Sequence, residues 1–321
     1  MKRLTRNTIT TRNPALFALI LLMFAILINL ILQPNMFARE TLNSNMRVFL
    51  PIVLLTAGQA VVILSGGIDI SVGAIVSIVN AFLATRVGLE GSTEAMWQYV
   101  AISLLLGVLA GAINGFFVAY LRLQPIITTY ATSFLYFGIA LLILPNPGGG
   151  IPSQISNLYR SSLPFGLPLA FFVIAIVLGV WFYIRSTRYG NYLYAVGGKA
   201  QAAYETAVPV TRVQFSTYII SGLMAASSGV AITMLSGSGN AEIGAAMTLN
   251  SITAVVIGGT ALSGGIGGVA GPVMGAITLG LFQNIVSFAH INTWWETLVK
   301  ALIIVAALAT PGIINLFRRR K

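Results

Sequence analysis

The chain has 321 residues, of which 57% are hydrophobic and only 8% are charged. Soluble domains carry roughly 25% charged residues, so this composition excludes a soluble enzyme, a disordered regulator and a coiled coil. The 18 Lys and Arg residues outnumber the 7 Asp and Glu residues, which gives a formal net charge of +11. The meaning of that excess depends on where the basic residues lie along the chain.

Ten stretches of the sequence are apolar enough to be membrane spans, which need about 20 residues in a helix. In chain order they are Pro14–Leu32, Val48–Leu64, Ile70–Thr85, Tyr99–Leu121, Ile126–Leu144, Phe165–Ile184, Val213–Leu235, Ile252–Leu262, Val269–Phe288 and Trp294–Phe317. Two of these stretches are short or interrupted by glycine. The sequence therefore predicts an all-α integral membrane protein with about ten transmembrane helices, forming a single domain over residues 1–321.

The positions of the basic residues support this count. If both termini lie inside, the inner segments hold Lys2, Arg3, Arg6, Arg12, Arg122, Arg185, Arg188, Lys199, Arg212, Arg318, Arg319, Arg320 and Lys321. The outer segments hold only Arg39, Arg47, Arg86 and Arg160. This asymmetry agrees with the positive-inside rule, so we predict cytoplasmic N- and C-termini and no affinity for nucleic acid. The longest inner loop covers about 185–213, and the longest outer loop covers about 146–164.

The counts of Cys and His restrict the chemistry. The chain has no Cys and a single His, His290, which excludes disulfides, thiolate metal sites and a His-rich metal cluster. Asn292, Trp294 and Trp295 follow His290, so we interpret it as an interfacial or loop residue. We predict no catalytic residue, bound metal or bound cofactor in this chain.

The string ILSGGIDISVGAIV, residues 63–76, interrupts an apolar run with Gly66 and Gly67 and then places Asp69 in apolar sequence. A carboxylate at membrane depth is costly and normally faces the protein interior or a wet cavity. Two interpretations remain open. Either Asp69 and Ser71 belong to a solute or ion pathway, or Asp69 is the N-cap of a helix over residues 70–84.

A second Gly-rich string, VVIGGTALSGGIGGVAGPV, occupies residues 255–273. Both strings contain an apolar run, a Gly pair, small polar residues and a second apolar run. This pattern is typical of interrupted helices in two related halves around a central pathway, so we predict pseudo-repeated halves. The pathway candidates are Gly66, Gly67, Asp69, Ser71, Asn80, Asn114, Gly258, Gly259 and Ser263. The side chains of Asn80 and Asn114 suit bonds between neighbouring helices equally well.

Small residues also recur at a spacing of four. The two series are Gly107, Gly111 and Gly115, and Gly267, Gly271 and Gly275. In an apolar helix this spacing lets two backbones approach closely, so it predicts tight packing between helices.

The long inner loop contains a segment with helical composition. Gly197 and Gly198 precede Lys199–Ala207, which is rich in Ala, Gln, Tyr and Glu, and Pro209 follows it. The pattern predicts a helix of about two turns, suited to docking a soluble partner or merely to connecting two spans. The Gly198–Lys199 pair is not a phosphate-binding loop, since it lacks the earlier Gly and the following Ser or Thr.

Four strings of the sequence taken together point to a family. ILSGGIDISVGAIV, YLYAVGGKAQAA, AVVIGGTALSGGIGGVAGPVMGA and WWETLVKALIIV resemble the ribose/xylose/galactose-type permeases of ABC importers, a family that includes autoinducer permeases. The resemblance runs in order from about Gly58 to the C-terminus. It implies a permease subunit of the bacterial inner membrane that translocates a sugar into the cytoplasm by alternating access.

The resemblance also implies partners. These are a second permease subunit, identical or different, a cytoplasmic ABC ATPase that binds ATP and Mg, and a periplasmic or lipoprotein sugar-binding protein. The segment matching Tyr194–Arg212 would contain the coupling helix that fits a cleft of the ATPase. The residues at or beside that contact would be Gly197, Gly198, Ala202, Ala203, Glu205 and Ala207.

Two positions depart from the family pattern, and one alternative function stays open. The family usually has Gly where Ala207 stands and Asp where Asn250 stands. The alternative is an autonomous, ion-coupled secondary transporter that uses Asp69 as its coupling carboxylate. A membrane enzyme is disfavoured, because His, Asp and Glu residues are not clustered in the sequence.

Overall fold

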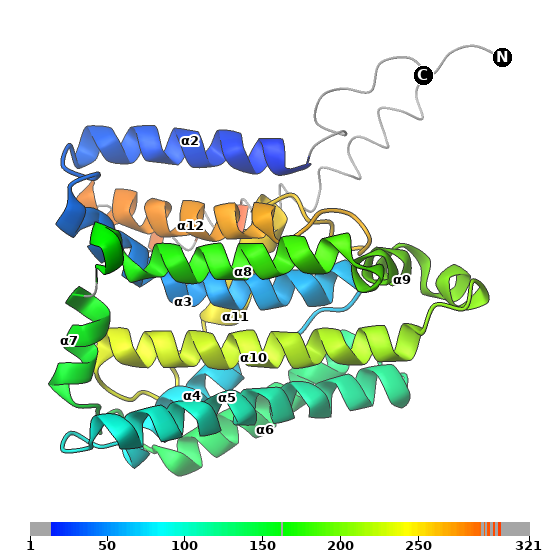
Figure 1. The fold of residues 1–321 in the computed structure, drawn as a ribbon, viewed down its shortest axis with the longest axis horizontal. Coiled ribbons are helices and arrows are strands. Elements are labelled where there is room, and N and C mark those ends of the chain that lie inside the picture. The colour runs from blue at the N-terminus through cyan, green and yellow to red at the C-terminus, as the bar shows by residue number, and fades with distance from the viewer. Residues whose placement is uncertain are drawn as a thin grey trace.

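The computed structural model describes residues 14–161 and 163–289, together with Asn292, Trp294, Trp295, Leu298, Ala301 and Leu302. These residues form a bundle of helices without β-strands, as Figure 1 shows. The helices are α2 (Pro14–Leu32), α3 (Arg39–Leu64), α4 (Val72–Arg86), α5 (Thr93–Gly115), η1 (Phe116–Tyr120), α6 (Pro125–Ile143), α7 (Ser153–Ser161), η2 (Pro164–Gly166), α8 (Leu169–Ser186), α9 (Arg188–Glu205), α10 (Val210–Ser236), α11 (Met247–Ile257) and α12 (Ala270–Phe288). His290 and most of the predicted span Trp294–Phe317 lie outside the described residues.

Six helical segments are long and apolar enough to cross a membrane. They are Arg39–Leu64, Thr93–Tyr120, Pro125–Ile143, Leu169–Ser186, Val210–Ser236 and Ala270–Phe288. Three further apolar helices, Leu16–Leu32, α4 and α11, are shorter. The predicted all-helical membrane protein is therefore confirmed for the described residues, while the count of about ten crossings stays a prediction.

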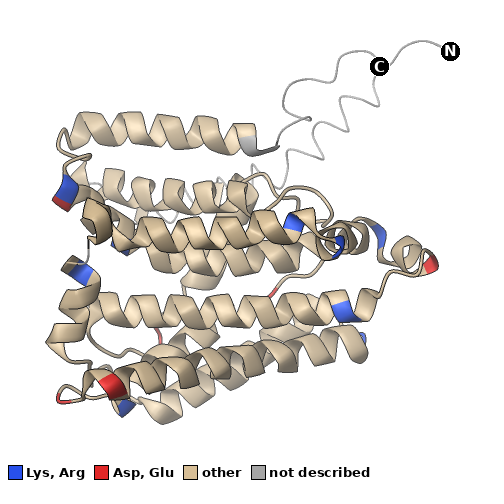
Figure 2. Cartoon of the chain, viewed as in Figure 1, with Lys and Arg blue, Asp and Glu red and all other residues tan. Residues whose placement is uncertain are grey.

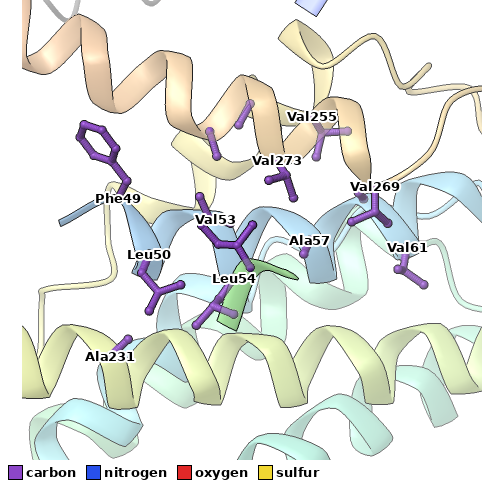
Figure 3. Close-up of a cluster of buried hydrophobic side chains, with 14 of the residues drawn as sticks. Phe49, Leu50, Val53, Leu54, Ala57, Val61, Ala231, Val255, Val269 and Val273 are labelled. Atoms are coloured by element: carbon purple, nitrogen blue, oxygen red, sulfur yellow. The ribbon is translucent and has the colours of Figure 1, made fainter. Parts of the chain in front are cut away.

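Helix α3 runs through the middle of the bundle, because its surface is apolar on nearly all sides and a helix of that kind is buried. Figure 3 shows Leu50 and Leu54 pointing toward Ala231 of α10, while Val269 and Val273 approach α3 from the other side. Within lipid the hydrophobic effect does not drive helices together, so membrane helices are held together by close packing of this kind.

The small residues of α5 pack as the sequence predicts. A Cβ atom on Gly107 would overlap the carbonyl oxygen of Gly222 on α10, and one on Gly111 would overlap that of Tyr218. The second series is only partly helical. Gly267 lies in the loop before α12 with φ 117°, because the helix begins at Ala270.

Two short helices begin inside the bundle. α4 has 15 residues and α11 has 11, and their first turns meet. The backbone amide of Gly73 donates to Thr248 Oγ1 at 3.0 Å, and the hydroxyl of Thr248 donates to the carbonyl oxygen of Ile70 at 3.2 Å. A Cβ atom on Gly73 would overlap the Gly244 carbonyl oxygen. The chain thus breaks between α3 and α4 and again between α11 and α12.

Charged side chains gather at the two ends of the bundle. Figure 2 shows most of the blue and red segments at the end that carries α7 and at the opposite end that carries α9. We call these the α7 end and the α9 end.

Candidate functional site

Helix α9 is longer than the sequence predicts. It spans Arg188–Glu205 with a kink at Lys199, where φ is −162° and ψ is 98°. The short helix predicted after Gly197 and Gly198 corresponds to the second half of α9, beyond this kink, and it ends at Glu205, two residues before the predicted end at Ala207. Thr187 caps the first half by accepting a bond from the amide of Gly190 at 3.4 Å, and the Gly197–Gly198 pair ends this first half at the kink.

Three glycine pairs from distant parts of the sequence meet at the α9 kink. Gly197 packs against the carbonyl of Leu64, and a Cβ atom there would lie 2.6 Å from the amide nitrogen of Gly265. Gly264 faces both Gly197 and Gly66, with a built Cβ 2.7 Å from the Gly197 carbonyl oxygen and 2.9 Å from the Gly66 Cα. The amide of Gly265 donates to the Leu64 carbonyl oxygen at 3.0 Å. We call this contact of 64–67, 197–198 and 264–265 the glycine junction.

Only glycine allows this approach of three backbones. Gly66, Gly264 and Gly265 have φ values of 87°, 83° and 70°, a left-handed conformation that costs other residues roughly 1–2 kcal/mol. Gly198 differs from its neighbour, since a Cβ atom on it would meet nothing within 4 Å. The glycine junction therefore depends on Gly197 and leaves Gly198 at its open edge.

Tyr194 fastens α9 to the second glycine-rich loop. Its hydroxyl donates to the carbonyl oxygen of Gly267 at 2.8 Å, and burial raises the pKa of the Tyr194 phenol, so it remains a neutral donor. Within the loop, Thr260 closes the turn, because its hydroxyl donates to Gly268 O at 2.8 Å and accepts from Gly268 N at 3.1 Å. The first half of α9 therefore contacts the loop between α11 and α12 at two points. Tyr194 bonds to Gly267, and Gly197 packs against Gly265.

The second half of α9 projects from the bundle (Figure 1). Ala202, Glu205 and Ala207 are exposed, whereas Ala203 is buried. Gln201 Nε2 donates to Glu205 Oε1 at 3.2 Å on the exposed face. This half of α9 offers a small protruding surface.

The end of α9 is a Schellman turn with alanine at the left-handed position. The amide of Val208 donates to Ala203 O and the amide of Ala207 donates to Tyr204 O, each at 3.0 Å. Ala207 has φ 61°, a conformation that glycine adopts far more readily. The departure from the family pattern at Ala207 therefore falls where the backbone favours glycine.

Asp69 is fully buried and lies in a polar chain across four helices. Its Oδ1 accepts bonds from the Ser71 amide at 3.0 Å and the Ser71 hydroxyl at 2.7 Å, and its Oδ2 accepts one from the Ser221 hydroxyl at 3.0 Å. The N-cap position of α4 is Ser71, not Asp69. Asp69 thus forms a turn just before the helix, which differs from the predicted cap because the helix begins two residues later.

Asn114 continues this polar chain. It donates to Ser71 Oγ at 2.7 Å and accepts from the Thr132 hydroxyl at 2.7 Å. Asn80 is also saturated, since it donates to Thr233 Oγ1 at 2.9 Å and accepts from the Asn240 amide at 2.6 Å. Both asparagines link neighbouring helices, and buried polar groups paired in this way hold helices in register.

The remaining pathway candidates are dispersed. Gly67 is buried beneath the Tyr218 hydroxyl, Gly258 packs against Pro272 at the start of α12, and Gly259 turns the chain with φ 78°. Ser263 is exposed at the α9 end. The structure brings Asp69, Ser71 and Asn114 together, and it places Gly66 in the glycine junction. Whether any of them contacts a solute stays a prediction.

Two cavities lie elsewhere, and none of the nine pathway candidates lines them. A cavity of about 660 Å³ at the α7 end is lined by residues of α3, α7 and α12. A smaller one of about 220 Å³ lies between α3, α10, α11 and α12 and includes Asn250. The larger cavity was not predicted from the sequence, because its lining residue Arg47 precedes the predicted span at Val48. The available signal was the polar pair Asn43 and Arg47, four residues apart on one helix face.

Comparison with known proteins decides the family. The sequence matches the family described as "Branched-chain amino acid transport system / permease component" over residues 41–308. The chain belongs to this family. Together with the relatives named below, this match confirms the resemblance drawn from the four sequence strings.

Several relatives match over most of the chain. The ribose import permease protein RbsC of Escherichia coli (strain K12) is 30% identical over 91% of both chains. The fructose import permease protein FruG of Bifidobacterium longum is 32% identical over 79% of this chain and 77% of its own. The autoinducer 2 import system permease protein LsrC of Enterobacter sp. (strain 638) is 31% identical over 97% of this chain and 89% of its own. No solved structure matches the chain.

Proposed function

We propose that this chain is the membrane-spanning permease subunit of an ATP-binding-cassette importer for a sugar or a sugar-like polar solute. The relatives named as ribose, fructose and autoinducer 2 import permeases support this proposal. The observation that carries it is the glycine junction, because it connects the protruding half of α9 to both broken segments of the bundle. A partner that moves α9 thereby moves the end of α3 and the loop between α11 and α12 as well.

The proposed orientation places the α9 end in the cytoplasm. Basic residues at that end are Arg122, Arg185, Arg188, Lys199 and Arg212. Those at the α7 end are partly offset by Glu40, Glu90 and Glu94. The positive-inside rule then favours a cytoplasmic α9 end. With about ten crossings, counting the short helices and the predicted last span, both termini are cytoplasmic as well.

The proposed mechanism is alternating access driven by a separate ATPase. The exposed face of α9 around Ala202, Glu205 and Ala207 is the docking surface for this ATPase, which binds ATP and Mg and performs the hydrolysis. This chain performs no chemistry. Closure of the ATPase would displace α9, and the close packing at Gly197 would pass the displacement to 64–67 and 264–265 with little loss, since packed backbones deform little.

Two further partners belong to the proposal. A second permease subunit, identical or different, would complete the pathway, and a periplasmic or lipoprotein sugar-binding protein would deliver the solute at the α7 end.

The test is reconstitution with defined components. The chain should be purified with its associated ATPase and placed in proteoliposomes with the sugar-binding protein, and labelled D-ribose uptake should be measured with and without ATP. ATP-dependent uptake supports the proposal. If no ATPase co-purifies and the chain alone accumulates solute along an ion gradient, the ion-coupled alternative replaces it.

A further inference from the structure

The cavity of about 660 Å³ at the α7 end is built from three helices far apart in the sequence. The start of α3, the end of α7 and the end of α12 meet there, at the left of Figure 1. Its polar lining includes Gln33, Asn43, Asn45, Arg47, Arg160 and Asn284. The volume falls within the roughly 300–1,000 Å³ typical of small-molecule sites.

Helix α7 is held across this cavity by unusual bonds to backbone carbonyls. Pro51 lacks the amide that would bond the carbonyl of Arg47 four residues earlier in α3. The Tyr159 hydroxyl of α7 takes that place and donates to Arg47 O at 2.9 Å. In return, Arg47 Nη1 and Asn43 Nδ2 donate to the Arg160 carbonyl oxygen at 2.9 Å and 2.8 Å. These bonds hold the end of α7 against α3 at the wall of the cavity.

The guanidinium groups of Arg47 and Arg160 donate most of their hydrogen bonds to other atoms of the protein. Arg160 donates through Nε and Nη2 to Leu235 O at the end of α10, at 3.2 Å and 2.6 Å. Arg47 donates to Arg160 O and, at 3.3 Å, to Ser44 Oγ. Glu40 adds a negative charge at the rim. A phosphate or carboxylate needs an open guanidinium fork, so this cavity does not favour an anion.

Unused hydrogen-bonding capacity surrounds the cavity. In the described part of the chain, Gln33 Oε1, Asn45 Nδ2 and Arg47 Nε have no partner. One of these atoms accepts and two donate, and a hydroxyl group satisfies both kinds because it donates and accepts. Gln33 and Asn45 are half-buried and both line the cavity. Phe288 and Leu163 add apolar surface for the C–H face of a ring.

We propose that this cavity is a binding site for a neutral polyhydroxylated solute of monosaccharide size, held by the amides of Gln33, Asn45 and Asn284. Its placement at the entry side rests on the proposed function. Asn45 and Asn284 are the central pair, because Asn284 Nδ2 donates to Asn45 Oδ1 at 3.1 Å and joins α3 to α12 across the cavity wall.

The experiment uses the full chain in lipid nanodiscs. Binding of D-ribose, D-fructose and, as an anionic probe, D-ribose 5-phosphate is measured by saturation-transfer NMR. The variants are Asn45→Ala and Asn284→Ala. The matched control is Asn157→Ala, since Asn157 is exposed on α7 and does not line the cavity. We expect saturable binding of a neutral sugar, about tenfold weaker in either cavity variant and unchanged in the control. Thermal unfolding of each variant shows that it is folded.

Three results would overturn the proposal. These are no saturable binding of either neutral sugar, tighter binding of the phosphorylated sugar, or equal weakening in Asn157→Ala. ATP-driven uptake by the reconstituted importer is measured in parallel. Uptake without sugar binding to the chain overturns the site alone. Sugar binding without ATP-driven uptake overturns the proposed function alone.

Discussion

Gly197 in the kinked helix α9 lies so close to Leu64 at the end of α3 that any side chain on Gly197 would overlap the Leu64 carbonyl oxygen. These two residues are 133 positions apart in sequence, and the contact is made by backbone atoms alone. The protruding half of α9 is therefore joined to the bundle core through a contact that tolerates no added atom.

Replacing Gly197 with Ala should separate α9 from the glycine junction. The added methyl group would overlap Leu64 O and approach Gly265 N to 2.6 Å, and overpacking of this kind costs about 1–3 kcal/mol. We expect a lower melting temperature and a loss of ATP-driven uptake in proteoliposomes. Gly198→Ala is the matched control, because its methyl group meets nothing within 4 Å. Equal effects of the two substitutions would contradict the role of the junction.

Replacing Ala207 with Gly should stabilise the end of α9. Ala207 has φ 61°, and glycine removes the steric cost of that conformation, about 1 kcal/mol. Hydrogen exchange at the Val208 amide, which closes the Schellman turn, should slow. The same change at Ala202, an exposed helical position, should instead destabilise α9 by about 1 kcal/mol. Faster exchange in Ala207→Gly would refute this account of the turn.

Replacing Asp69 with Asn should preserve folding and uptake. The amide oxygen can accept both bonds from Ser71, and the amide nitrogen can donate to the Ser221 hydroxyl, which now accepts. Asp69→Ala removes these partners and leaves buried polar groups unpaired, at a cost of about 1–3 kcal/mol. Yield from the membrane and D-ribose uptake distinguish the two variants. Normal folding with abolished uptake in Asp69→Asn would favour the ion-coupled alternative.

Replacing Glu205 with Arg should disturb the proposed contact with the ATPase and leave membrane insertion intact. Glu205 is exposed on the protruding half of α9 and bonds only to Gln201 in the described part of the chain. Reversing a charge inside an interface slows uptake by about tenfold. Glu90→Arg, an exposed acid at the α7 end, is the control. Unchanged ATP-driven uptake in Glu205→Arg would argue against docking at this surface.

Much of the architecture was predictable, because a long apolar run in the sequence identifies a membrane helix. Each of the six long apolar helical segments overlaps one predicted span, and α6 (Pro125–Ile143) differs from the predicted Ile126–Leu144 by one residue at each end. α3 begins nine residues before the predicted span at Val48. Polar residues such as Asn43 and Arg47 are helical there because the Arg160 carbonyl oxygen of α7 accepts hydrogen bonds from both, which apolar length does not reveal.

The candidate site was predictable only in part. The glycine strings were identifiable from sequence, since interruption of an apolar run is a local pattern. The meeting of Gly66, Gly197 and Gly264 was not, because it depends on the approach of three backbones far apart in the chain. The sequence indicated a break after Gly197 and Gly198, where α9 kinks at Lys199, but not the helical turns before it, which pack against Leu64 and Gly265 through Gly197.

The sequence by itself determined the kind of protein. A charge content of 8% indicates a membrane protein, because burial of apolar surface and exclusion of charge from lipid act through composition alone, and the distribution of the basic residues predicts its orientation. The tertiary structure decided which polar residues satisfy one another. Asp69 accepts hydrogen bonds from Ser71 and Ser221. In the described part of the chain, by contrast, Asn45 Nδ2 and Arg47 Nε beside the cavity have no hydrogen-bond partner. That difference arises from packing between distant helices, where a polar atom either meets a partner or does not.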